Sequence, residues 1–176
     1  MRIELNLNDS SSTPLTRELA RQIRVAHSAG GELCLDFREV FQQQLGLSLR
    51  AGGSKRRVYA SLKGLADREW VDDGLVLAVS NMTCSEHWAV EVCANALVLP
   101  ATRPLTPRQV LQVLPINPQE RLRWTKDGRM PQSGTVKMRR AHIISVPTYA
   151  VETIAALAAD PTILHKWRVS DAKSAA

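Results

Sequence analysis

The chain contains 176 residues, of which 44% are hydrophobic and 23% are charged. This length suits one domain or two small ones, and the apolar fraction is large enough to form a core, which excludes a wholly disordered chain. The formal net charge of +6 favours a partner that carries phosphate groups or an acidic surface. The charge is local, because the stretch from Arg103 to Arg140 holds nine basic and only two acidic residues.

The cysteines and the apolar runs indicate which cellular location and which ligands to expect. Cys34, Cys84 and Cys93 are an odd number and do not form a disulfide framework, and Cys84, His87 and Cys93 lack the spacing of a four-ligand zinc site. No apolar run approaches the roughly 20 residues that span a bilayer, and the polar start "MRIELNLNDSSS" differs from a signal peptide. We therefore expect a cytoplasmic protein with no metal, no cofactor and no membrane contact.

The first part of the chain alternates patterns typical of strands and helices. A short strand is expected in "RIELNLN", a helix from Pro14 to Ser28 after several potential N-caps, and a second strand in "ELCLDF". A helix from Arg38 to Leu45 and a loop, "RAGGSK", should follow. Residues 80–100 fit either a helix from Ser85 or a continuing strand.

Ser54 is the predicted N-cap of a helix that runs to Glu69, and "WVDDGLVLAV" predicts two strands joined by an Asp-Asp-Gly turn. This order of elements over residues 14–79 resembles a winged helix, with 54–69 as its recognition helix. The resemblance implies that the first turn of that helix, which holds Lys55, Arg56 and Arg57, enters the major groove of DNA. A solvated basic face on a helical hairpin is the alternative.

The stretch "LPATRPLTP" predicts a linker over residues 100–107. Two helices should come after it, because Thr106 and Asn117 are potential N-caps and each precedes a proline that suits a first helical turn. A helix from Thr148 to Arg168, divided near "ADP" at residues 159–161, is expected close to the end of the chain.

The segment "LTPRQVLQVLPINPQERLRWTKDGRMP", with the basic stretch after it and "ISVPTYAVETIAAL", resembles the helix-turn-helix of MerR-type regulators and excisionases over residues 105–157. Trp124, Gly128, Arg129 and Pro131 stand where that family has its aromatic, glycine, basic and proline residues. The resemblance implies two helices, a hairpin wing and a further helix. The chain departs from the family at the turn, where "PINP" replaces the usual Gly-Val-Ser.

Because of this departure, Glu120 falls at the start of the second helix, where it would face the groove. Trp124 should bury its ring between that helix and the wing. Gly128 should permit a positive φ at the helix end, and Pro131 should stop the helix. "QSG" at residues 132–134 is the expected hairpin tip, after which Val136 and Met138 alternate with the bases of the wing, Lys137, Arg139 and Arg140.

The sequence thus predicts an α+β protein made of two small winged-helix-like units. The expected divisions are a winged-helix-like domain over residues 1–99, a Pro-containing linker over 100–107, a helix-turn-helix domain over 108–170 and a disordered tail over 171–176. The linker is placed there because the stretch holds three prolines, from Pro100 to Pro107.

The chain shows no catalytic constellation. Its four histidines are scattered, and "AGGSKRR" lacks the spacing of a phosphate-binding loop. We expect no enzyme, but a bacterial or mobile-element DNA-binding protein with a role in transcription, recombination or plasmid replication and maintenance. The predicted contacts to duplex DNA are Lys55, Arg56, Arg57, Arg121, Arg123, Lys126, Arg129, Lys137, Arg139 and Arg140. The structural supports are Trp124, Gly128 and Pro131.

Two other functions fit the same sequence. The chain could be a non-catalytic, nucleic-acid-binding subunit of a larger nucleoprotein complex, or a homodimer, with its apolar surfaces against neighbouring subunits. It could also be a small adaptor whose basic charge meets an acidic protein. Few aromatic residues are free to stack on bases, which favours duplex DNA over a single strand.

Overall fold

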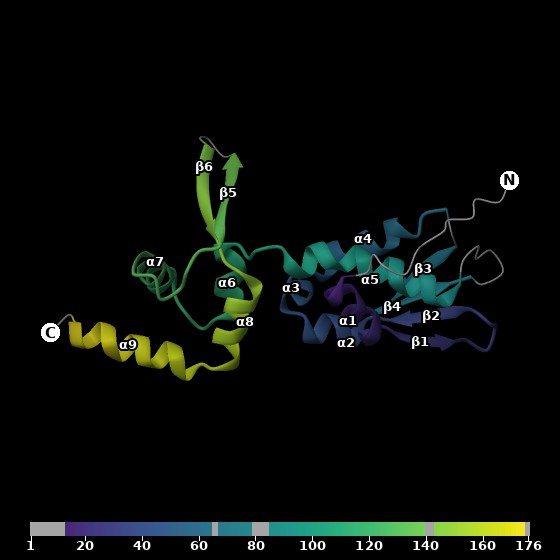
Figure 1. Ribbon diagram of the computed structural model, residues 1–176, viewed down its shortest axis with the longest axis horizontal. Coiled ribbons are helices and arrows are strands. Elements are labelled where there is room, and N and C mark those ends of the chain that lie inside the picture. The colour runs from purple at the N-terminus through teal and green to yellow at the C-terminus, as the bar shows by residue number, and fades with distance from the viewer. Residues whose placement is uncertain (1–12, 65–66, 79–84, 140–142, 175–176) are drawn as a thin grey trace. The chain divides into compact units, whose positions relative to one another are not determined.

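The computed structural model describes residues 13–64, 67–78, 85–139 and 143–174 (Figure 1). The chain forms two compact units, which divide between Ala101 and Thr102 and are called unit 1 and unit 2. Both contain helices and strands, so the predicted mixture of helix and sheet is confirmed. The strand expected in "RIELNLN" lies outside the described residues.

Unit 1 packs helices against an antiparallel sheet whose strands lie in the order β1-β2-β4-β3. Leu35 of β2 pairs with Val25 of β1 on one side and with Leu75 of β4 on the other. The elements are α1 (Pro14–Gln22), β1 (Arg24–His27), β2 (Leu33–Asp36), α2 (Arg38–Gln43), α3 (Leu45–Ser48), α4 (Ala51–Ser61), β3 (Arg68–Val71), β4 (Gly74–Leu77) and α5 (Glu86–Thr102).

The core of unit 1 lies between the sheet and the helices. Every second residue of β2 and β4 is fully buried, which is the alternation of a sheet with one covered face. Among the buried residues that the helices add are Leu19, Val40, Leu47, Val58, Ala89, Cys93 and Leu97. Cys93 is therefore a core residue.

Several predictions for unit 1 are wrong, among them the helix end at Glu69, because α4 ends at Ser61 and Glu69 lies in β3. Helix α1 ends at Gln22 instead of Ser28, because Arg24–His27 pair with β2 as strand β1. The predicted loop "RAGGSK" is the beginning of α4, so Ser54 is a buried interior residue of that helix and not its N-cap. Two glycines are poor helix formers, and tertiary packing of α3 and α4 against the core overrides that preference.

Helix α5 settles the choice between helix and strand for residues 85–100 in favour of a helix. The predicted linker therefore begins too early, because Pro100 lies inside the last turn of α5. Because proline has no backbone N–H, the last turn of α5 lacks one helical hydrogen bond at this residue. The guanidinium of Arg50 donates 2.8 Å to the Pro100 carbonyl oxygen, which holds this turn in place.

Unit 2 contains two helices, a hairpin and two further helices in the part that the structure describes. Both predicted caps are confirmed, because the side chains of Thr106 and Asn117 each accept a backbone hydrogen bond at the start of their helix. The predicted division near residue 160 is also confirmed. The elements are α6 (Pro107–Val113), α7 (Pro118–Lys126), β5 (Gly134–Arg139), β6 (Ile143–Thr148), α8 (Val151–Ala159) and α9 (Thr162–Ser174).

The β5–β6 hairpin extends away from the helices of unit 2 (Figure 1), and its strands pair from Gly134↔Thr148 to Arg139↔Ile143. The predicted tip at "QSG" is wrong, because Ser133 already pairs with Thr148 at the base of the hairpin, and the connection falls in residues 140–142, outside the described residues. The β-branched run "IISVPT" favours the longer pairing. The residues of β6 change from exposed at Ile143 to buried at Thr148.

Candidate nucleic-acid interface

The positive charge of the protein resides in unit 2. Residues 102–176 include twelve Lys or Arg and five Asp or Glu, a net charge of +7, whereas residues 1–101 include eleven and twelve, a net charge of −1. The difference places the candidate interface for a polyanion in unit 2.

Helix α7 is held on two sides and open on a third. Glu120 and Trp124 are buried toward α9, and Arg121 and Thr125 contact the Tyr149 hydroxyl. The remaining side is exposed and carries residues at spacings of i, i+3, i+4 and i+7, which lie on one face of a helix. These residues, Gln119, Leu122, Arg123 and Lys126, are called the open α7 face.

Trp124 is fully buried, as the sequence predicts, although its neighbour is different from the expected one. Its ring meets that of Trp167 in α9 edge to face, with 5.0 Å between the ring centroids. Its Nε1 donates a 3.0 Å hydrogen bond to Asp171 Oδ2. Both contacts are with helix α9, so Trp124 fixes α7 against α9.

Asp171 joins α9 to two cations, one in α7 and one just after it. Its carboxylate accepts from Arg129 at 2.6 Å and forms an ion pair with Arg123 at 3.0 Å, in addition to the bond from Trp124. The predicted disordered tail from residue 171 is therefore wrong for residues 171–174, which continue α9. The buried indole N–H and the two guanidinium groups supply the interactions that hold this end of the helix.

Glu120 does not face a groove, in contrast to the sequence expectation. Its Oε2 accepts from the backbone N–H of Asn117 at 2.9 Å and closes the capping box of α7. Its Oε1 accepts from Arg168 of α9 at 2.7 Å. The acidic residue is thereby neutralised inside unit 2 and does not oppose a phosphate.

The predicted nucleic-acid contacts of α7 divide into two groups. Arg121 is buried and donates a 2.6 Å hydrogen bond to the Tyr149 hydroxyl, and Arg129 is bound by Asp127 and Asp171, so both have structural partners. Arg123 and Lys126 are exposed on the open α7 face, although Arg123 also pairs with Asp171. Gly128 has the predicted positive φ, +85°, where α7 ends.

The sequence analysis missed the α9 residues that complete this site. Trp167, Arg168 and Asp171 meet Trp124 and Glu120 from more than 40 residues away along the chain. One pattern in the sequence points to these residues. Glu120 and Trp124 are four residues apart, and so are Trp167 and Asp171. Each pair lies on one face of its helix.

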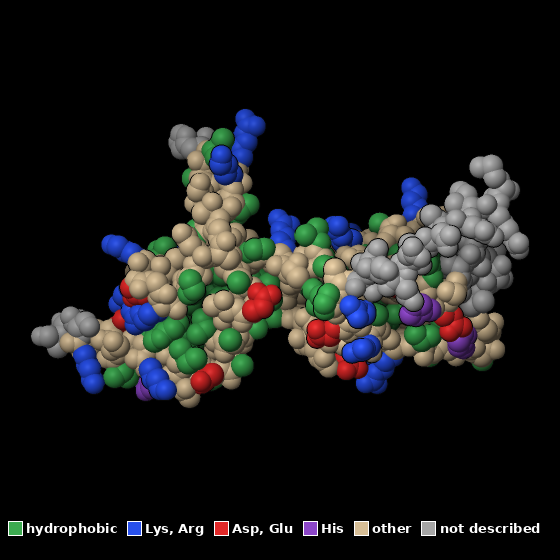
Figure 2. All heavy atoms as spheres, in the orientation of Figure 1, with side chains coloured by type: hydrophobic (Ala, Val, Ile, Leu, Met, Phe, Trp, Pro, Cys, Tyr) green, Lys and Arg blue, Asp and Glu red, His purple; other side chains and the backbone are tan. Residues whose placement is uncertain are grey.

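Two basic residues of the hairpin point to one side. Lys137 and Arg139 are exposed and two residues apart, so they share a face of the ribbon. Figure 2 shows basic side chains at the far end of this hairpin. Val136 is half-buried and pairs with Val146 on the other face. Arg140 lies outside the described residues.

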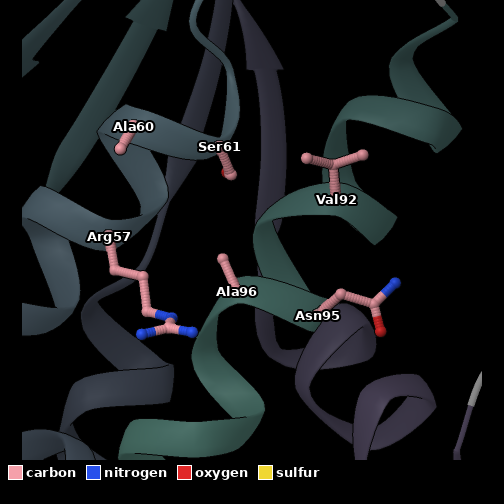
Figure 3. Close-up of a pocket in the computed structure, with 6 residues that line it drawn as sticks. All are labelled: Arg57, Ala60, Ser61, Val92, Asn95 and Ala96. Carbon is pink, nitrogen blue, oxygen red and sulfur yellow. The ribbon is translucent and has the colours of Figure 1, made fainter.

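The predicted basic turn of unit 1 is not one patch. Lys55 forms a 2.8 Å ion pair with Asp73 and lies 5.3 Å from the centroid of the Trp70 ring. Arg56 is exposed, and Arg57 extends into the space between α4 and α5 (Figure 3). These three residues diverge because consecutive residues project about 100° apart around a helix.

The space beside Arg57 is an open pocket of about 480 Å³ within unit 1. It is lined mostly by small side chains of α4 and α5 (Figure 3). Its larger polar side chains are Arg57 and Asn95. The amide oxygen of Asn95 already accepts a hydrogen bond from the Thr16 hydroxyl. The pocket therefore offers a single cation, Arg57, and little else that would recognise a ligand.

Comparison of the chain with protein-family models, curated proteins and solved structures gives no match. Across residues 13–64, 67–78, 85–139 and 143–174, no group of three or more His, Cys, Asp or Glu side chains could hold a metal ion. No helix in the same ranges is long and apolar enough to cross a membrane.

The carboxylates between α7 and α9 predict a loss of stability in acid. Hydrogen bonds from Arg129 and then Trp124 hold the pKa of Asp171 below its usual range, and Arg168 does the same to the pKa of Glu120. A lowered folded-state pKa gives stabilisation that is complete above the unfolded-state value, about 4, and is lost as the pH falls through the folded-state value. Urea unfolding of unit 2 should therefore need less denaturant as the pH falls below about 4.

The variant Asp171→Asn isolates this effect. It should be less stable than the parent near pH 6 and should show a shallower decline of stability in acid, because one of the titrating groups is gone. Glu152→Gln, which changes an exposed carboxylate of α8, is the matched control and should follow the parent. Equal pH dependence in the parent and Asp171→Asn would contradict the assignment.

Proposed function

We propose that the protein binds duplex DNA without catalysing a reaction, and that unit 2 is its main DNA-binding part. The observation that carries the proposal is the arrangement of the open α7 face beside a projecting hairpin that carries Lys137 and Arg139. A capped helix, a short turn, a second capped helix and a hairpin follow one another in the order of a MerR- or excisionase-like helix-turn-helix with a wing.

In this proposal α7 lies in the major groove with its open face toward the bases. Glutamine can bond two edge atoms of adenine, arginine can bond two of guanine, and an apolar side chain can contact the thymine methyl group. Gln119, Arg123 and Leu122 offer these three chemistries on one face. Lys137 and Arg139 would contact phosphates and so fix the position of the protein on the duplex without reading sequence.

Unit 1 has a smaller role in this proposal. Its elements follow a winged-helix-like order, and Arg56 and Arg57 are exposed for additional backbone contacts, whereas Lys55 is paired with Asp73. The net charge of −1 does not attract a polyanion over the whole unit. We therefore propose that the second basic surface expected from the sequence supplements the first.

The biological setting that we propose is a bacterial cytoplasm or a mobile element, with a role in transcription, recombination or plasmid replication and maintenance. A second candidate is a non-catalytic subunit of a nucleoprotein complex. Val71 and Leu99 favour it, because these apolar side chains of unit 1 are 55% and 53% exposed. A partner subunit could cover them while unit 2 holds the nucleic acid.

Binding of duplex DNA, single-stranded DNA and RNA over a range of salt concentrations tests the proposal. Duplex preference and a steep decline with salt are expected, because bound cations displace counterions from the phosphates. Equal binding of all three nucleic acids would favour the nucleoprotein subunit. Binding that does not depend on salt would overturn both candidates.

The hairpin bases should contribute to affinity for every sequence. Replacing Lys137 and Arg139 together with alanine should reduce the log–log salt slope by about 2 units, roughly one for each lost phosphate contact. It should weaken specific and random duplexes alike. The matched control is Lys166→Ala with Lys173→Ala, which removes two exposed cations from α9 and should leave the slope nearly unchanged. An unchanged slope in the hairpin variant would assign its bases to solvated surface.

A further inference from the structure

The last described pair of the hairpin, Arg139 and Ile143, includes an unusually exposed apolar side chain. Ile143 is 70% exposed, the highest value among the large hydrophobic residues that the structure describes as exposed. It is the first residue of β6 and stands opposite Arg139 in the register of the hairpin. The buried residues of unit 2 at this hairpin, Thr148 and Tyr149, lie at its other end.

The alternation of the ribbon makes Ile143 an exception. Residues opposite one another share a face, and every second residue along a strand returns to that face. Val136, Ile144 and Val146 therefore form the apolar face, of which the two valines are half-buried. Ile143 lies on the opposite face, with Lys137 and Arg139, where a polar residue would fit the pattern.

An exposed isoleucine beside two cations matches the side chains with which some proteins bend DNA. Proteins that bend DNA insert apolar side chains, isoleucine among them, between base steps from the minor groove. Arginine and lysine side chains contact phosphates. Six paired residues at about 3.4 Å each give a ribbon roughly 20 Å long, whereas the minor groove is about 7.5 Å deep. The paired part of the hairpin is thus longer than the minor groove is deep, so the last pair, Arg139 and Ile143, can approach the stacked bases.

We propose that Ile143 is a wedge that enters the minor groove of bound duplex DNA and kinks it, while Arg139 and Lys137 contact the flanking phosphates. The inference rests on the proposed function and adds the bending of the DNA to it. The charge of the hairpin face selects this partner, because a second copy of the chain would bring the same cations together and they would repel one another.

The test uses two duplexes of one sequence, of which one carries a central mismatch that makes unstacking easier. The parent protein should bind the mismatched duplex about tenfold more tightly and should shorten the end-to-end distance of both, measured by energy transfer between end-attached dyes. Ile143→Ser should lose most of the shortening and reduce the preference to less than about twofold. Ile143→Leu should retain both properties.

Ile144→Ser is the matched control, because it changes an adjacent isoleucine on the other face of the same ribbon. It should keep the mismatch preference and the bending. If Ile143→Ser binds, bends and discriminates as the parent does, the wedge is wrong and the proposed function stands. If the parent binds no duplex at any salt concentration, both fail. Conversion of a dimer to a monomer by Ile143→Ser, seen by sedimentation, would also overturn the wedge.

Discussion

Replacing Trp124 with alanine should lower the free energy of unfolding of unit 2 by about 3–5 kcal/mol, the usual effect of truncating a large buried aromatic side chain. The ring is fully buried, and its edge-to-face contact with Trp167 joins α7 to α9. The substitution also removes the N–H that Asp171 accepts. Hydrogen exchange of the full chain, resolved by residue, should show faster exchange at the backbone amides of residues 102–174.

Two variants separate the parts of this effect. Trp124→Phe keeps an aromatic ring against Trp167 but loses the hydrogen bond to Asp171, so it should be less harmful than alanine. Leu122→Ala removes an apolar side chain from the same helix at a position that is 56% exposed, and stability should change little. If Trp124→Ala exchanges like the parent, the ring does not hold α9 to α7.

The DNA binding that we propose depends on the orientation of α7. The open α7 face is presented outward only while Trp124 and Glu120 hold the opposite side of the helix against α9. Without that contact, Arg123 and Lys126 would still be exposed, but they would no longer lie on one fixed face of unit 2. A helix that reads DNA needs its contacting side chains to be both exposed and fixed in position, because binding contacts depend on geometry to within about 0.5 Å.

Features that depend on neighbouring residues were predictable from the sequence. Thr106 with Pro107 and Asn117 with Pro118 begin their helices as expected, because an N-cap acts on backbone groups two or three residues away. Gly128 adopts a positive φ for a similarly local reason. The Asp-Asp-Gly turn of unit 1 also joins two paired strands as predicted.

Features that depend on distant partners were not predictable in this way. The start of α4 at "AGG" is set by packing that a propensity rule does not include. Glu120 and Arg121 look like polar residues of a DNA-facing helix until Arg168 and Tyr149 are placed beside them. A single sequence does not show that residues 28 or 48 positions apart are in contact. It therefore does not distinguish buried arginines from exposed ones.

The structure consequently narrows the candidate interface. Of the cations named from the sequence in unit 2, Arg121 is buried and Arg129 is held by two aspartates. Lys126, Lys137 and Arg139 are exposed, and Arg123 shares Asp171 with Arg129. The inward arginines position α7, and the outward cations are those from which a salt-dependent affinity is expected.

Replacing Gly46 with alanine should destabilise unit 1 by about 1–3 kcal/mol, the range for forcing extra atoms into a packed interior. Gly46 lies in α3 and is buried where that helix approaches the end of α5. A Cβ at this position would overlap the carbonyl oxygen of Ala101 and lie 3.1 Å from that of Pro100. Both obstacles are backbone atoms, so the strain can be relieved only by moving one helix away from the other.

The matched control is Gly52→Ala in α4, where a Cβ would meet no atom within 4 Å. Because alanine is the better helix former, this substitution should be neutral or stabilise unit 1 by up to about 1 kcal/mol. Urea unfolding of the two variants and the parent, followed by amide exchange in residues 13–101, measures the difference. The opposite signs expected for two glycine-to-alanine changes only six residues apart arise entirely from what surrounds each Cα. Equal stability of both variants would mean that α3 and α5 do not approach closely in solution.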